Sequence, residues 1–161
     1  MKYTLIRSLP AIIPIIVGVV LPATAFQFAQ RGQNYVAGQD DDTDEMVLRV
    51  ESALPMVTAL NSPGFLGLGG FLLACRRRFD TRMLWLVSMI GTAIMAAIVL
   101  SSHMGMYDLL YIRGRMHSTS GIGFMFTSFA CGAVAVIVAA GGWLVQKRLV
   151  RNTEGAERNL S

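Results

Sequence analysis

Apolar residues in this chain gather into four long segments that contain no Asp, Glu, Lys or Arg. A helix needs roughly 20 mostly apolar residues to cross a hydrocarbon core about 30 Å thick. Each segment exceeds that length, and a helix satisfies its own backbone hydrogen bonds in lipid. The pattern therefore predicts an all-α membrane protein, a single domain over residues 1–161 built as a bundle of four transmembrane helices. The charge-free segments are residues 8–30, 52–75, 83–107 and 116–146.

Local signals narrow these segments to predicted spans. The first, third and fourth spans are predicted at 8–29, 83–102 and 120–146, with a cytoplasmic tail at 147–161. The second segment has two alternatives, because the sequence Asn61-Ser62-Pro63-Gly64 is typical of a turn followed by a helix start. Either the span begins at the turn and covers 62–78, or one kinked helix covers 54–75.

The loop before the second span, residues 30–60, contains an amphipathic pattern. Apolar residues recur there at spacings of four and three, which places them on one face of a helix. If the second span begins near residue 62, this pattern predicts an external amphipathic helix over 43–60. The apolar positions are Met46, Val50, Ala53, Val57 and Leu60.

The distribution of basic residues predicts the orientation of the spans. Four crossings place ten Lys and Arg residues on one side and four on the other, and the richer side of a membrane protein is normally cytoplasmic. Both termini are therefore expected in the cytoplasm. The ten residues are Lys2, Arg7, Arg76, Arg77, Arg78, Arg82, Lys147, Arg148, Arg151 and Arg158, and the four are Arg31, Arg49, Arg113 and Arg115.

The first segment also resembles a secretion signal, which leaves a second topology open. Lys2 and Arg7 precede an apolar core, and Pro22-Ala23-Thr24-Ala25 has the small residues of a signal-peptidase site. Cleavage after residue 25 would leave three spans and an external N-terminus.

Composition agrees with a membrane protein. Hydrophobic residues make up 53% of the chain, charged residues 15%, and the mean hydropathy is +0.52, whereas soluble domains contain roughly 25% charged residues. The net charge of +4 comes from short basic clusters between apolar runs, not from a basic face of the kind that binds nucleic acid. The expected partners are the lipid bilayer and another membrane protein, with no nucleic acid.

An acidic stretch in the external loop has two interpretations. Asp40, Asp42, Asp44 and Glu51 occupy positions 1, 3, 5 and 12 of a calcium-binding loop pattern. Position 6 is Glu45, where that loop requires glycine. The favoured interpretation is a capping box and a favourable helix dipole at the start of the amphipathic helix. A divalent-cation site is the alternative.

A second candidate site lies where the third and fourth spans reach the external side. His103 and Met104 end the third span, Met106 follows, and His117 precedes the fourth. Imidazole with thioether suits Cu(I), and two histidines can ligate haem. The spacing matches no specific motif, so interfacial packing is the favoured role and a metal site the alternative.

Motif searching favours a protein that is not an enzyme and has no cofactor. The sequence has no Ser/His/Asp set, phosphate-binding loop, CxxC pair or helical metalloprotease motif, and no ionisable residue lies deep within a predicted span. We expect a small non-enzymatic accessory subunit or interaction partner of a membrane complex, in a bacterial inner membrane. Two alternatives are an immunity-type protein against a membrane-active toxin and a redox subunit that uses His103 and His117.

Overall fold

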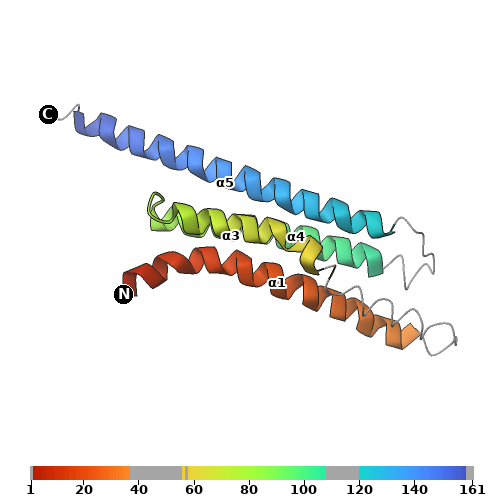
Figure 1. Cartoon of the computed structure of the whole chain (residues 1–161). Coiled ribbons are helices and arrows are strands. Elements are labelled where there is room, and N and C mark those ends of the chain that lie inside the picture. The colour runs from red at the N-terminus through yellow and green to blue at the C-terminus, as the bar shows by residue number, and fades with distance from the viewer. Residues whose placement is uncertain (1, 37–55, 57, 108–119, 159–161) are drawn as a thin grey trace.

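The protein is almost entirely helical in the part of the chain that the computed structural model describes, residues 2–36, 56, 58–107 and 120–158. Successive helices alternate in direction, so both termini lie at one end of the bundle (Figure 1). No strand occurs in these residues, which confirms the predicted all-α class. The helices are α1 (Lys2–Val36), α3 (Pro63–Cys75), α4 (Thr81–Tyr107) and α5 (Ser120–Arg158).

Three of the helices are long and apolar enough to cross a membrane, which is consistent with an integral membrane protein. Their candidate spans are Ile6–Ala25, Thr81–Met104 and Phe126–Asn152. These correspond to the first, third and fourth predicted spans. The fourth apolar helix, α3, has 13 residues, or about 20 Å of length, because it begins at Pro63.

The chain enters α3 through a helical turn instead of a loop. Residues 58–61 are helical, and Ser62 has φ −78° and ψ −31°. The amide of Ser62 donates to the Thr58 carbonyl at 3.1 Å, and the amide of Leu66 donates to the Ser62 carbonyl at 3.0 Å. The i to i−4 pattern therefore continues on both sides of Pro63, which has no amide hydrogen of its own to donate.

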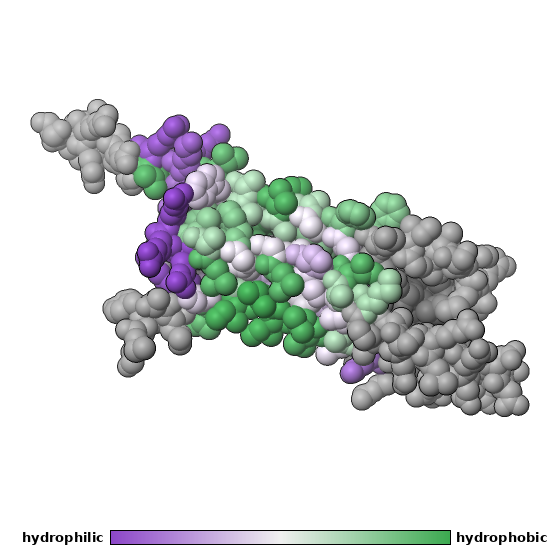
Figure 2. Space-filling view, viewed as in Figure 1, coloured by the Kyte–Doolittle hydropathy of each residue, from purple (hydrophilic) through white to green (hydrophobic). Residues whose placement is uncertain are grey.

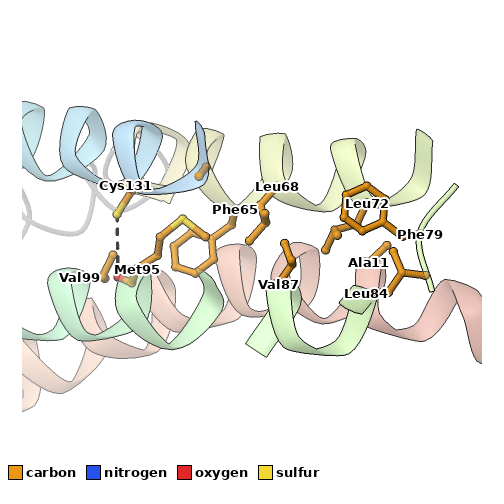
Figure 3. Close-up of a cluster of buried hydrophobic side chains, with 11 residues drawn as sticks. Ala11, Phe65, Leu68, Leu72, Phe79, Leu84, Val87, Met95, Val99 and Cys131 are labelled. Carbon is orange, nitrogen blue, oxygen red and sulfur yellow. Dashed lines mark hydrogen bonds between the residues drawn. The ribbon is translucent and has the colours of Figure 1, made fainter. Parts of the chain in front are cut away.

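Helices α3 and α4 form the centre of the bundle. Helix α1 packs against both of them, and α5 packs against the same two helices (Figure 1). A row of buried apolar side chains joins these elements along the bundle axis (Figure 3). It comprises Ala11 of α1, Phe65, Leu68 and Leu72 of α3, Phe79 of the following turn, Leu84, Val87, Met95 and Val99 of α4, and Cys131 and Ala135 of α5.

Glycines set how closely the helices approach. A Cβ atom on Gly18 would lie 2.4 Å from the Phe65 side chain, and one on Gly64 would lie 2.7 Å from the backbone of Cys131. Small residues at helix contacts allow backbones to approach where lipid provides no hydrophobic force between helices. The α1–α3 and α3–α5 contacts both depend on glycine.

The outer surface of the bundle is apolar along its middle (Figure 2). Helix α5 is the least covered candidate span, with 17% of its window buried against 39% for the span of α4. Large side chains such as Phe129 and Val136 are about 70% exposed, at 73% and 69%. A water-soluble chain of this size would bury such residues, so this surface fits a lipid environment.

Two predicted features fall wholly or mostly outside the described residues. These features are the external loop predicted over 30–60 and the amphipathic helix predicted over 43–60, most of whose residues the structure does not describe. The described residues 58–61 are the part of that segment that leads into α3.

Candidate functional site

Among the side chains that the structure describes, six polar ones are buried inside the bundle, and they are the first candidates for chemistry within the membrane. A polar group that loses water without gaining a hydrogen bond is destabilising. The bonds that these groups form therefore indicate what they do. The six are Asn61, Ser62, Ser88, Thr92, His103 and Thr127.

Ser88 of α4 donates a hydrogen bond to the backbone carbonyl of Pro10 in α1. In a regular helix that carbonyl accepts from the amide four residues later. The residue there is Pro14, which has no amide hydrogen. The serine hydroxyl thus takes the place of the missing donor and joins α4 to α1 at a point buried within both helices.

The same arrangement recurs two turns further along α1. The Ser62 hydroxyl donates to the Gly18 carbonyl at 2.9 Å, and the residue four positions after Gly18 is Pro22. The Thr58 carbonyl lies 2.5 Å from the same hydroxyl. The entry to α3 is therefore fixed to α1 where a second proline has left a carbonyl without its helical donor.

Helix α5 is attached to its neighbours by further contacts to backbone carbonyls. Ser128 donates to the carbonyl of Leu60, just before the Pro63 kink. The Cys131 thiol contacts the Met95 carbonyl of α4 at 3.9 Å (Figure 3). These polar groups join helices, and they do so with neutral side chains.

Two residues of the predicted histidine–methionine site, His103 and Met104, differ in burial on α4. His103 is buried, and its Nδ1 lies 2.7 Å from the Val99 carbonyl, which can only accept a hydrogen. Beside it, Ser102 bonds Thr127 of α5 at 2.7 Å. Met104 is 74% exposed and faces away from the bundle. Adjacent residues of a helix point about 100° apart, which explains why His103 is buried and Met104 is exposed.

The other predicted ligands lie outside the residues whose side chains are described. These are Met106 and His117 of the histidine–methionine site, and Asp40, Asp42, Asp44 and Glu51 of the calcium pattern. Within the described side chains, no group of three His, Cys, Asp or Glu residues is placed to hold a metal ion.

Basic side chains gather at the end of the bundle that carries both termini (Figure 2). Arg76 donates to the Ser8 hydroxyl of α1 at 3.2 Å, and the Arg78 guanidinium lies 5.9 Å from the centre of the Trp143 ring of α5. We call this end the basic rim. It comprises Arg7, Arg76, Arg77, Arg78, Arg82, Lys147, Arg148 and Arg151.

Sequence reasoning missed the serine–carbonyl pairs, although one half of the signal was visible. A proline within an apolar helix identifies which carbonyl lacks a donor, namely the one four residues earlier. For Pro14 and Pro22 these are Pro10 and Gly18. The donors Ser62 and Ser88 come from other helices, and their identity depends on how the helices pack.

Comparison of the chain with protein-family models, curated proteins and solved structures finds no match.

Proposed function

We propose that the chain crosses the membrane four times, with α3 and the preceding turn as the second crossing. Helical hydrogen bonding continues through Ser62, so residues 58–75 form one kinked apolar helix. At 1.5 Å per residue this helix is about 27 Å long. Bilayers adapt to a hydrophobic length a few ångströms below their own thickness. Of the two alternatives for the second segment, this geometry favours the kinked span.

In this proposal both termini are cytoplasmic and the membrane is a bacterial inner membrane. An even number of crossings agrees with the two termini lying at one end of the bundle (Figure 1). The basic rim surrounds that end, as expected for the cytoplasmic side.

The first span is retained in this proposal. Helix α1 continues without a break through the Pro22–Ala25 segment that resembles a cleavage site. The carbonyls of Pro10 and Gly18 accept hydrogen bonds from α4 and from the entry to α3. Removal of residues 1–25 would take away the acceptor of the buried Ser88 hydroxyl and leave Ser62 with the Thr58 carbonyl alone, which favours a packed span over a secretion signal.

The function that this geometry supports best is that of a non-enzymatic accessory protein, which binds a transmembrane helix of another membrane protein. Within the described spans, the hydroxyls of Ser62, Ser88 and Ser128 are used to join helices. Charged residues lie at the ends of the candidate spans. Coupled transporters and pumps commonly carry ionisable residues deep in the membrane. The serine hydroxyls inside the bundle therefore serve to hold its own helices together.

Two glycines on the outer face of α3 carry the partner proposal. Cβ atoms added to Gly67 and Gly70 would meet nothing within 4 Å, and the same holds for Gly132 and Gly141 of α5. Gly67 and Gly70 are three residues apart and share one face of their helix, whereas Gly132 and Gly141 lie on opposite faces. An exposed helical glycine destabilises a helix by roughly 0.5–1 kcal/mol relative to alanine, and no close helix contact in the described structure requires glycine at these two positions. Pro63 and Ala74 share this exposed face. Close approach by a second helix would explain the small residues.

Site-directed photocrosslinking in the native membrane tests this proposal. A photoreactive residue at Leu66, which is 45% exposed beside the two glycines, should crosslink one protein that also co-purifies in mild detergent. The same residue at Ile12, which is 39% exposed on the outer face of α1, is the control and should crosslink lipid alone.

A matched pair of glycine substitutions then separates partner binding from folding. Gly67→Leu and Gly141→Leu both place the new Cβ where nothing lies within 4 Å, so the bundle should tolerate both. Only Gly67→Leu should remove the crosslinked partner. A protein that purifies alone and gives equal products from both photoreactive positions would contradict the accessory function.

A further inference from the structure

The basic rim contains far more positive than negative charge. Eight basic side chains lie there, and Asp80 is the single carboxylate among the side chains that the structure describes. Asp80 accepts a hydrogen bond from the Thr81 amide at 2.8 Å, at the start of α4. No ion pair joins a basic to an acidic side chain in the described part of the chain. Among the described side chains, the positive charge at this end is therefore largely unbalanced.

Two aromatic residues place the basic rim at the level of lipid headgroups. The chain has two tryptophans, Trp85 near the start of α4 and Trp143 towards the end of α5, and both are 36% exposed. Tryptophan prefers the boundary between hydrocarbon and headgroups. The arginines beside these rings therefore lie where lipid phosphates lie.

Around Trp143 the geometry is more specific. Phe79, which is buried, packs against the Trp143 ring with a centroid distance of 5.9 Å, and Phe71 packs against Phe79 at 6.0 Å. The Arg78 guanidinium lies over the same indole ring at 5.9 Å. Lys147 is one helical turn after Trp143, and residues four apart share a face of a helix. One cation thus lies over the anchored ring, and a second follows on the same face of α5.

We propose that this arrangement is a binding site for the phosphate of an anionic phospholipid. Arg78 and Lys147 hold the phosphate above the Trp143 ring, and the other residues of the basic rim strengthen the attraction. A guanidinium that contacts an aromatic face keeps its N–H donors available for a phosphate oxygen. Basic residues between helices on the cytoplasmic side are typical of headgroup sites.

The surroundings of the site fit a lipid better than a free phosphate ion. Leu144 and Val145 follow Trp143 on α5 and are 59% and 48% exposed. Leu144 lies three residues before Lys147, so it offers an apolar surface next to this cation, and Val145 extends the apolar surface around the helix. A phospholipid satisfies both parts of this surface, with its phosphate on the cations and its acyl chains on the apolar side chains. Inorganic phosphate satisfies only the first part.

Quenching of tryptophan fluorescence by brominated lipids measures this binding directly. A Trp85→Phe protein, in which Trp143 is the only tryptophan, is reconstituted into phosphatidylcholine vesicles that contain brominated phosphatidylglycerol or brominated phosphatidylcholine. We expect phosphatidylglycerol to be preferred next to Trp143 by about fivefold, the factor that corresponds to one basic residue at an anionic surface. Millimolar inorganic phosphate should leave this preference unchanged.

Paired charge substitutions distinguish a local site from the general field of the basic rim. Arg78→Gln/Lys147→Gln should abolish the preference, and Arg78→Lys/Lys147→Arg should retain most of it. The control Arg7→Gln/Arg82→Gln removes the same charge from α1 and α4 and should retain most of it as well. Equal quenching by the two lipids, displacement by inorganic phosphate, or equal losses in the two Gln pairs would each overturn the proposal. Circular dichroism of each variant verifies that the helices are intact.

Discussion

Ser88→Ala is the substitution whose effect follows most directly from the structure. The change removes the hydroxyl that donates to the Pro10 carbonyl and leaves every other contact of α4 in place. Both residues are buried, and Pro14 provides no amide as a replacement donor. A buried carbonyl therefore loses its only donor among the described groups.

The expected loss of stability lies between two limits. Side-chain hydrogen bonds between membrane helices are worth about 0.6 kcal/mol on average and at most about 1.7 kcal/mol. A buried group left without a partner costs about 1–3 kcal/mol. Since this carbonyl has no helical donor, we expect the upper part of the first range, about 1.5 kcal/mol. That is roughly a tenfold change in the folding equilibrium constant.

A control on the same helix removes the effect of changing serine to alanine. Ser101 is exposed, and its hydroxyl bonds the Ile98 carbonyl of its own helix at 3.0 Å. Ser101→Ala carries the same gain in helix propensity without loss of an interhelical bond, and surface changes of this kind usually stay within about 0.5 kcal/mol. The difference between the two variants isolates the bond between Ser88 and Pro10.

A double-mutant cycle with Pro14→Ala identifies the cause. Alanine at position 14 restores the amide that bonds the Pro10 carbonyl in a regular helix. In that background Ser88→Ala should cost less than about 0.5 kcal/mol, which gives a coupling energy of about 1 kcal/mol. The assay is unfolding by sodium dodecyl sulfate in mixed micelles, followed by far-UV circular dichroism. A Ser88→Ala cost no larger than that of Ser101→Ala, or a cost unchanged by Pro14→Ala, would refute the reasoning.

Three further predictions rest on the packing of the bundle. Gly64→Ala places a Cβ 2.7 Å from the Cys131 backbone and should cost about 1–3 kcal/mol in the same assay, whereas Gly67→Ala should be neutral or stabilise by up to about 1 kcal/mol. Maleimide should label Cys75 alone in the folded protein and both cysteines after unfolding, because Cys131 is buried. The intact mass of the protein gives the number of labels, and two labels on the folded protein would contradict this packing. Phe79→Ala removes a buried ring packed between two aromatic side chains and should cost about 3–5 kcal/mol and shift tryptophan emission to the red.

The absence of charge predicted the long helices well, because a helix in lipid needs only length and apolar side chains. The helices α1, α4 and α5 continue beyond their predicted spans at one or both ends, since helical hydrogen bonding does not stop at the membrane surface. The second segment was harder to predict. Its turn signal is real, as Pro63 begins α3, but continuation through Ser62 depends on contacts that a single segment does not encode.

The candidate site was predictable in part only. The sequence placed His103 and Met104 together near the outer end of α4, whereas the phase of the helix buries the histidine and exposes the methionine. The buried positions Ser88, Met95 and Val99 show which face of α4 is turned towards the bundle. The sequence of α4 alone does not identify that face, because it depends on where the neighbouring helices pack. Whether His117 lies near His103 stays a prediction, because position 117 is outside the described residues.

The three prolines of α1 show how depth in the bilayer determines which side chains a helix needs. Pro10, Pro14 and Pro22 each leave one carbonyl without its helical donor, those of Ile6, Pro10 and Gly18. The latter two lie within the candidate span, where water cannot replace the donor, and each accepts from a serine of another element. Ile6 is the first residue of that span and is 50% exposed, so its carbonyl lies where water and headgroups can serve as donors. The prolines thus leave two carbonyl acceptors deep in α1, and donors from α4 and from the entry to α3 must lie opposite them. These hydrogen bonds specify which faces of the helices meet. In lipid, apolar contact alone would not favour one face of a helix over another.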